Sequence, residues 1–413
     1  MTRDLEQEID QFLGNTEHKR IGVAVSGGGD SMALLHLLVV WAEKRDIEVQ
    51  CVTVDHQLRP EAQDEAIQVA SWCDSWGVQH DILRWDGWDG QGNTQAQARE
   101  ARYRLIAEWA QRESISAVAL GHTQDDQAET VVMRLMRGAG VDGLSAMAPK
   151  RVSHGLLWLR PLLDVSRLEL RAYLNAQGVD WADDPSNDDM RFDRIKARKA
   201  MATLDLPCRA LAQVAANMQT AQRALDVQTE TALKALAKID CGALQVDWQG
   251  FCALPQEIQR RLLIAAFNWL SGSDYPPRGQ SVVGVLDKLR AGKTTTLDGC
   301  LMLHKGDALW IIRELKALED EKATANALWD GRWRCETTGA VEPDVHIAAL
   351  GAAGLAECPD WRRLGIPRDA LLATPAVWQG RNLVAAPLVK PAAAWQAVLT
   401  RGESALFDAV FSH

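Results

Sequence analysis

Residues 21–31 (IGVAVSGGGDS) constrain the fold of this 413-residue chain more than any other segment. Residues 21–25 are apolar enough for a buried parallel strand, and residues 32–41 have the apolar spacing of a helix. Between them, three glycines allow a sharp turn and let backbone N–H groups approach a ligand. The start of the following helix adds partial positive charge, which favours phosphate oxygens. We therefore predict a phosphate-binding turn made of Ser26, Gly27, Gly28, Gly29, Asp30 and Ser31.

This turn is not a Walker loop, which needs a glycine, four residues and then Gly-Lys-Ser/Thr. The chain has Gly-Lys-Thr at residues 292–294, but Asp287 stands where the earlier glycine is required. Asp30 suits an anion site only when a cation such as Mg²⁺ lies between its carboxylate and the phosphates. A tight strand-to-helix turn that binds nothing is the alternative interpretation.

The bulk properties indicate a multidomain protein without membrane segments. The length exceeds that of an ordinary domain, so two or three domains are expected. No apolar run is long enough to span a membrane, and the acidic N-terminus lacks the apolar core of a signal peptide, so we expect a cytoplasmic protein. The eight cysteines include no Cys-x-x-Cys pair, which favours buried thiols over a zinc or iron–sulfur site. A net charge of −10 argues against indiscriminate nucleic-acid binding but leaves a local basic patch open.

Strand-like and helix-like segments alternate in the first half of the chain. Predicted strands at 49–55, 80–85 and 117–121 alternate with predicted helices at 61–76, 94–111 and 126–137. This order predicts an α/β fold with a doubly wound, Rossmann-like parallel sheet. The polar motifs follow the carboxyl ends of the predicted strands, where ligands bind in such sheets.

The second half of the chain changes character and is predicted to form two more domains. Residues 209–238, 255–271 and 279–290 have helical spacing, and 294–314 are typical of a hairpin. A charged link at 316–322 precedes a third region with strand-like residues near its end. We predict a first domain at 1–208, a mainly helical domain at 209–315 and a small α+β domain at 325–413.

A second polar motif lies at residues 121–130 (GHTQDDQAET). His122 and two aspartates stand where a strand ends and a helix begins. Asp126 is placed to share Mg²⁺ with Asp30, because both follow neighbouring strands. His122 could stabilise charge on a transferring phosphate. In the alternative interpretation Asp125 is only a helix N-cap and the other polar residues lie on the surface.

Three further segments carry weaker signals. Asp55 and His56 close the second strand and suit a nucleotide contact, although a capped turn explains them equally well. Arg102 lies on a predicted helix and could reach a carboxylate, beside a surface pair of residues four apart. A dense basic run follows an acidic loop, and it fits either a solvated helix face or a phosphate-backbone patch. The run comprises Arg191, Arg194, Lys196, Arg198 and Lys199.

Together these motifs resemble those of the tRNA(Ile)-lysidine synthetases, a family of the ATP-pyrophosphatase (PP-loop, N-type) superfamily. The family patterns SGGxDS, VDHGLR, AR-x-x-R/RY, GHxxDDQAET, RGxGxxGLxxM, RPLL and D-x-SNxD…R have their counterparts at residues 26–31, 54–59, 101–104, 121–130, 137–147, 160–163 and 183–198. The resemblance covers the first half of the chain well and the remainder more loosely. Gln57 replaces the usual glycine of VDHGLR, and Ile195 stands where many members have asparagine.

The resemblance implies an ATP-dependent ligase that acts on an isoleucine tRNA with a CAU anticodon. C2 of the wobble cytidine is activated as an adenylate with loss of pyrophosphate, and the lysine ε-amine then displaces AMP to form lysidine. ATP, Mg²⁺ and L-lysine are therefore the expected small partners, and a homodimer is left open. The rival interpretations are a tRNA thiolation enzyme of the same superfamily and a non-catalytic tRNA-binding protein.

The same resemblance assigns roles to individual residues. Ser26, Gly27, Gly28, Gly29, Asp30, Ser31, Asp55 and His56 would bind ATP or pyrophosphate. Asp30, His122, Asp126 and Arg194 would act in catalysis, with Asp30 and Asp126 as the Mg²⁺ ligands. Glu129 would take the lysine ammonium and Arg102 its carboxylate. Arg191, Arg194, Lys196 and Arg198 would bind tRNA, helped by the second and third domains.

Overall fold

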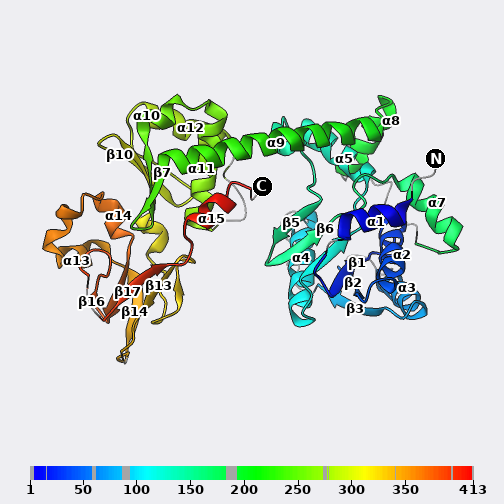
Figure 1. The fold of residues 1–413 in the computed structure, drawn as a ribbon, viewed down its shortest axis with the longest axis horizontal. Helices are drawn as coiled ribbons and strands as arrows, with labels where there is room; N and C mark the ends of the chain where they lie inside the picture. The colour runs from blue at the N-terminus through cyan, green and yellow to red at the C-terminus, as the bar shows by residue number, and fades with distance from the viewer. Residues whose placement is uncertain are drawn as a thin grey trace. The chain divides into compact units, whose positions relative to one another are not determined.

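The computed structural model describes residues 4–14, 16–57, 62–85, 94–182, 193–272, 277, 279–339, 341–391 and 394–411. The chain forms two compact units, Met1–Gln222 and Arg223–His413 (Figure 1). None of the helices in these described ranges combines the length and apolar character needed to cross a membrane. Residues 183–192, and with them the predicted tRNA contact Arg191, lie outside the described residues.

The first unit is built on a six-stranded sheet. Its strands are β1 (Arg20–Ala24), β2 (Glu48–Asp55), β3 (Gln79–Arg84), β4 (Ala117–Leu120), β5 (Lys150–Ser153) and β6 (Leu156–Leu159), in the order β3-β2-β1-β4-β6-β5. All neighbours run parallel except the edge strand β5, which is antiparallel to β6. Its helices are α1 (Leu5–Leu13), α2 (Gly29–Glu43), α3 (Ala62–Ser75), α4 (Thr94–Arg112), α5 (Gln124–Leu135), α6 (Val141–Leu144), α7 (Arg167–Gln177) and α8 (Asp193–Thr203), and α9 (Cys208–Leu236) begins in it. The predicted doubly wound α/β fold is confirmed.

Helices cover both faces of this sheet, because successive side chains of each strand point to opposite faces. Ile21 and Val23 of β1 pack with α1, α2, α3 and α7, whereas Val118 of β4 packs on the other face with α4. Gly22 makes room on that second face, since a Cβ there would lie 2.9 Å from both the Trp109 ring and Val118. The bulky indole of α4 therefore fits directly against the centre of the sheet.

The winding direction of the sheet reverses at β1. β1 pairs with β2 on one side and with β4 on the other. In doubly wound sheets, ligands bind outside the carboxyl ends of the strands at such a reversal. The segments after β1 and β4 meet closely, because a Cβ on Gly121 would lie 2.9 Å from the Cα of Ser31. The two main polar motifs thus follow neighbouring strands, as predicted.

The second unit contains two apolar cores. The first lies between α11 (Gln256–Ser271) and α12 (Gly279–Arg290) and an antiparallel sheet ordered β7-β8-β11-β10-β9. The second lies between sheets β12-β13-β17 and β14-β15-β16 and the helices α13 and α14. The remaining bounds are β7 (Ala237–Asp240), β8 (Ala243–Asp247), α10 (Trp248–Ala253), β9 (Thr295–Leu297), β10 (Cys300–Lys305), β11 (Ala308–Arg313), η2 (Leu315–Leu318), β12 (Leu328–Trp329), β13 (Trp333–Glu336), β14 (Val345–Ala349), α13 (Gly351–Ala356), η3 (Pro359–Leu364), α14 (Arg368–Leu372), β15 (Pro375–Gln379), β16 (Asn382–Ala385), β17 (Gln396–Leu399) and α15 (Glu403–Asp408).

The hairpin of β7 and β8 was not predicted, and its turn explains why. Cys241 and Gly242 join the two strands with φ values of +47° and +71°. Hairpin turns of this kind normally have the sequence Asn-Gly or Asp-Gly, so a Cys-Gly pair does not predict one. The predicted hairpin at 294–314 contains the three strands β9, β10 and β11. The predicted domain limits at 208, 315 and 325 remain predictions.

Candidate functional site

The glycine turn after β1 is held in shape by two serine hydroxyls. Gly27 has a φ of +85°, in the region where glycine is favoured. The Ser31 hydroxyl accepts a hydrogen bond from the Ser26 N–H at 3.2 Å and donates one to the Gly28 carbonyl at 2.9 Å. The Ser26 and Ser31 hydroxyl oxygens lie 3.3 Å apart. Because α2 begins at Gly29, hydroxyls and the positive end of a helix face the same place, which suits phosphate.

The segment after α7, which includes Trp181 and Ala182, packs against the glycine turn. The Ala182 N–H donates to the Gly27 carbonyl at 2.9 Å. A Cβ on Gly29 would lie 3.4 Å from the Trp181 ring, so the indole sits against the turn. Sequence reasoning gave Trp181 no role, because its contact with the turn depends on the tertiary fold.

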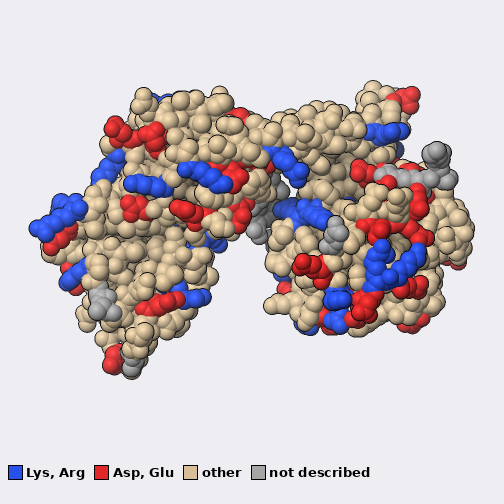
Figure 2. All heavy atoms as spheres, in the orientation of Figure 1, with Lys and Arg blue, Asp and Glu red and all other residues tan. Residues whose placement is uncertain are grey.

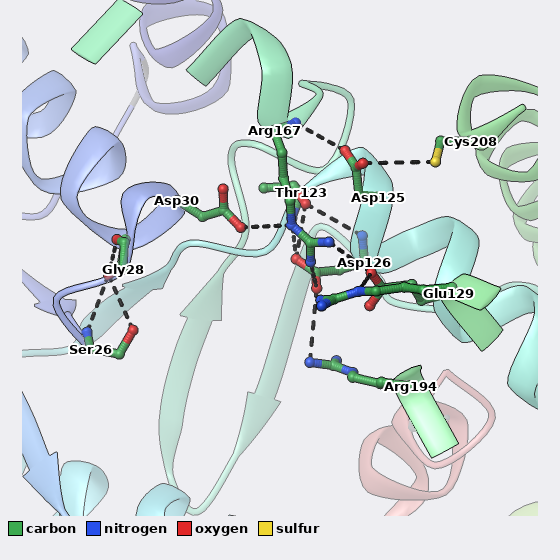
Figure 3. Close-up of polar contacts among 12 residues, drawn as sticks. Ser26, Gly28, Asp30, Thr123, Asp125, Asp126, Glu129, Arg167, Arg194 and Cys208 are labelled. Carbon is green, nitrogen blue, oxygen red and sulfur yellow. Dashed lines mark hydrogen bonds and ion pairs between the residues drawn. The ribbon is translucent and has the colours of Figure 1, made fainter. Parts of the chain in front are cut away.

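Arg167 joins the two carboxylates that were predicted to bind Mg²⁺ and the one that was predicted to bind the lysine ammonium (Figure 3). Its Nε lies 3.0 Å from Asp30 Oδ2, and its Nη2 lies 2.7 Å from Asp126 Oδ1. Its Nη1 lies 2.7 Å from Glu129 Oε1. Its backbone N–H also donates to Asp125 Oδ2 at 2.9 Å. Although burial opposes its charge, these carboxylates raise the pKa of Arg167 above its ordinary value.

Arg167 is the functional residue that sequence reasoning missed. It is the first residue of α7, and the N-cap of that helix is Ser166, which forms a capping box with Glu169. The Ser-x-x-Glu pattern marks where the helix begins and so identifies Arg167 as the residue that opens it. Nothing in the local sequence indicates that this arginine faces segments far away in the chain.

Asp126 serves both the helix and the site. Thr123 is the N-cap of α5, and its N–H and hydroxyl donate to Asp126 Oδ2 at 2.9 and 3.0 Å. The other oxygen, Oδ1, faces Arg167 and lies 3.8 Å from Arg194 Nη1. Burial alone would raise the pKa of Asp126, but Arg167 and Arg194 hold it below its usual value. The alternative in which Asp125 is the N-cap is therefore wrong.

The carboxylates of Asp30 and Asp126 both contact the Arg167 guanidinium, so they are placed to share one cation. Burial raises the pKa of Asp30, and Arg167 opposes that rise. Carboxylate oxygens combined with phosphate oxygens are the usual ligands of Mg²⁺ at nucleotide sites. Within the described ranges no group of three His, Cys, Asp or Glu residues could hold a metal ion by itself. The pair therefore fits a Mg²⁺ whose remaining ligands come from phosphate and water.

Glu129 is buried on α5 and keeps one oxygen without a partner. Its Oε1 accepts from Arg167 and also from Arg198 Nε at 2.6 Å. Its Oε2 is buried and has no hydrogen-bond partner among the residues that the structure describes. A buried acceptor without a donor is costly, so this oxygen is suited to a cationic ligand.

His56, His122 and Arg102 form a second, electropositive side of the site. Burial and then the nearby charge of Arg102 lower the pKa of His56. Burial, opposed by Asp126 and assisted by Arg102, lowers the pKa of His122 to about 3. In the described part of the chain, Nδ1 of each histidine is buried without a partner. His122 is therefore a neutral imidazole that can stabilise phosphate charge by donating a hydrogen bond.

This depressed pKa predicts how His122 affects stability at acid pH. The pKa of His122 in the unfolded chain is near 6.5. Below that pH the imidazole is protonated in the unfolded chain but stays neutral in the folded protein. The free energy of unfolding should therefore fall by about 2 kcal/mol between pH 7 and pH 5 because of this residue. The variant His122→Asn should lose less stability over that interval, measured by urea unfolding. Equal losses in both proteins would contradict the neutral buried imidazole.

Asp55 caps its own turn. Asp55 Oδ1 accepts from the Gln57 N–H at 2.8 Å, and Gln57 has a φ of +52°. This left-handed conformation explains why glycine is usual at that position. The His56 ring packs edge-on against Trp85 at 5.8 Å. The capped-turn interpretation is thus realised, and nucleotide contact by Asp55 and His56 remains a prediction.

The basic run on α8 is divided between the site and the surface. Arg194 lies near Asp126, and Arg198 bonds Glu129. Lys196 lies 3.3 Å from the exposed Asp193. The structure therefore brings Arg194 and Arg198 to the carboxylates, whereas the tRNA contacts predicted for the run stay predictions.

Comparisons with known proteins identify relatives of this chain. Residues 1–204 match the family model of the PP-loop domain. The chain is 48% identical over 414 residues to the tRNA(Ile)-lysidine synthase of Ruegeria pomeroyi, covering 100% of this chain and 98% of that one. It is 35% identical over 350 residues to the tRNA(Ile)-lysidine synthase of Wolbachia sp. subsp. Brugia malayi, covering 81% and 80%. A solved U34-tRNA thiolase of Methanococcus maripaludis aligns over 52% of this chain and 77% of that chain, with a TM-score of 0.46 and 15% identity.

Proposed function

The chain belongs to the tRNA(Ile)-lysidine synthase family, and from this premise we propose that it joins lysine to C2 of the wobble cytidine in an isoleucine tRNA with a CAU anticodon. In the proposed reaction the C2 oxygen attacks the α-phosphorus of ATP, and the bond to the β-phosphate breaks to release pyrophosphate. The lysine ε-amine then forms a bond to C2, the bond from C2 to the AMP oxygen breaks, and the amine loses a proton.

One observation carries the proposal: the glycine turn and three carboxylates converge at the carboxyl ends of β1 and β4. The turn supports a bound triphosphate through Ser26, Ser31 and the start of α2. Asp30 and Asp126 would hold Mg²⁺, which when bound would neutralise charge on the phosphates. His122 and Arg194 would act on the charge that develops at the α-phosphate.

The proposed lysine site uses opposite charges on the two sides of the crevice. The buried Glu129 Oε2 has no partner within the described residues and would accept from an ammonium group. Arg102 has no carboxylate partner in the described ranges, and burial lowers its pKa. A bound carboxylate would offset the free-energy cost of burying the Arg102 charge. The ε-amine of lysine must stay free to attack C2, so the α-ammonium group would be the one that contacts Glu129.

The remaining proposed contacts lie outside this crevice. Arg191, Arg194, Lys196, Arg198 and the second and third predicted domains would bind the tRNA. The cytoplasm, where tRNA is modified, is the proposed place of action. A homodimer stays an open prediction.

Incorporation of labelled lysine into an unmodified CAU-anticodon isoleucine tRNA tests the proposal. We expect label only with Mg·ATP, and none in elongator methionine tRNA, which has the same anticodon. Absence of label together with a Mg·ATP-dependent thermal shift would contradict the ligase proposal and favour the thiolation enzyme. Absence of both label and shift would favour the non-catalytic tRNA-binding protein.

A further inference from the structure

We propose that exposed arginines on α4 and β5, backed by one arginine on α5 and one immediately after β6, form a binding surface for the phosphate backbone of the substrate RNA. These residues, called the arginine cluster below, are Arg99, Arg134, Arg151 and Arg160. The inference rests on the proposed function, since it names where that function's substrate strand would lie. The cluster is supplied by other elements than the basic run on α8 and the glycine turn.

Two aromatic rings link Arg99 of α4 to the strand pair that carries Arg151. Arg99 Nη2 donates to the Tyr103 hydroxyl at 3.3 Å, and its guanidinium lies 5.2 Å from the ring centre. The Tyr103 ring packs edge-on against Trp158 at 4.6 Å, and Trp158 is the cross-strand partner of Arg151. Arg160 follows β6, and its Nη1 donates to the Ala148 carbonyl at 2.8 Å.

The Arg134 side chain is fixed by backbone carbonyls of the segment that follows α5. Its Nη1 donates to the carbonyls of Gly143 and Ala146 at 2.7 and 3.1 Å, so it is fixed on the loop that follows α5. Burial, and then the like charges of Arg99, Arg151 and Arg137, lower its pKa. Burial is also the main cause that lowers the pKa of Arg160, and the like charges of Arg99 and Arg151 add to it.

No carboxylate balances this positive charge in the described part of the chain. The ion pairs found there include none of the four arginines, whereas Lys196 and Arg198 of α8 each meet an acidic side chain. Arg160 is only 4% exposed, and its Nε is buried without a partner within the described ranges. Clustered like charges destabilise a folded protein. In a chain with a net charge of −10, such a cluster is most simply explained by an anionic ligand.

The layout fits an extended polyanion better than a single phosphate. Arg99 and Arg151 are exposed, and they come from a helix and from the edge strand of the sheet. Figure 2 shows Lys and Arg spheres gathered where β5 lies in Figure 1. On α4, Arg102 follows Arg99 by three residues, so the cluster continues into the side of the crevice that holds His122. An RNA strand entering the crevice would therefore pass along it, and guanidinium groups match phosphate geometry.

The test is the salt dependence of tRNA binding by the double variant Arg99→Ala/Arg151→Ala. Both side chains are exposed, so the variant should fold. We expect the slope of log K against log salt to become shallower by about 1.4, roughly 0.7 for each lost phosphate contact. Affinity for the CAU isoleucine tRNA should fall about tenfold at moderate salt. The thermal shift caused by Mg·ATP should stay that of the wild-type protein.

Lys150→Ala is the matched control. Lys150 precedes Arg151 on β5 but points to the opposite face, where its ammonium lies 5.1 Å from the Phe12 ring. This variant should keep the wild-type slope. An unchanged slope in the double variant, or an equal change in the control, would overturn the inference. If the wild type incorporates lysine and the double variant binds normally, only the inference fails. If the slope changes but the wild type incorporates no lysine, the proposed ligase activity fails and the RNA surface stands.

Discussion

Replacing Asp30 with asparagine is expected to lower the rate of lysine incorporation about a thousandfold while leaving the protein folded. The carboxylate lies at the start of α2, immediately beyond the glycine turn, and its only described side-chain partner is Arg167 at 3.0 Å. Asparagine keeps the shape and an oxygen that accepts from Arg167, but it lacks the negative charge proposed to hold Mg²⁺. The loss should therefore appear in turnover and leave the thermal midpoint almost unchanged.

Asp46→Asn supplies the control for that experiment. Asp46 is fully exposed and reaches only Lys19 at 4.0 Å, so its change should affect neither rate nor stability. Near-wild-type turnover by Asp30→Asn at saturating ATP would refute the assignment of Asp30 as a metal ligand. A large fall in the thermal midpoint would instead show that the residue is structural.

Arg167→Met is expected to have the largest effect on stability, with a loss of roughly 3 kcal/mol at neutral pH. The variant leaves Asp30, Asp126 and Glu129 close together without the cation that they share. Glu129 would keep Arg198, and Asp126 would keep the more distant Arg194. Methionine fills much of the arginine volume, so the loss reports charge more than a cavity.

The pH dependence and Mg²⁺ distinguish this explanation from a packing defect. In the wild type Arg167 lowers the pKa of Asp126, so its stabilisation is present above the unfolded pKa and is lost as the pH falls through the folded pKa. The difference between the two proteins should therefore stay constant at neutral pH and narrow as the pH falls below about 3.8, the ordinary pKa of an aspartate. Millimolar Mg²⁺ should raise the thermal midpoint of the variant more than that of the wild type.

Arg171→Met, on the same helix but exposed, is the control for this variant, and it should be close to neutral. A deficit in Arg167→Met that stays constant with pH, and that Mg²⁺ does not reduce, would contradict the role of Arg167 as the shared cation.

The sequence predicted those parts of the molecule that depend on local pattern. The sheet, the turn at Gly27 and the polar start of α5 can each be recognised from a pattern of a few neighbouring residues, because strand ends and helix caps require particular residue types. Arg167 cannot be recognised in this way, since its role depends on three carboxylates from α2 and α5. The arginine cluster was missed for the same reason, because its members come from α4, α5, β5 and the segment after β6.

The capping box at the start of α5 affects how sequences of related proteins should be interpreted. Because Asp126 holds the Thr123 cap, a relative that had lost ligase activity would still be under selection to keep that aspartate for folding. Asp30 has no capping role in the described structure, and its ion pair with Arg167 is one of three that this arginine makes, so Asp30 could drift more readily once the chemistry was gone. When genes of this kind are sorted into working enzymes and inactive descendants, position 30 is therefore the informative one, and an intact GHxxDDQAET motif alone is weak proof of activity.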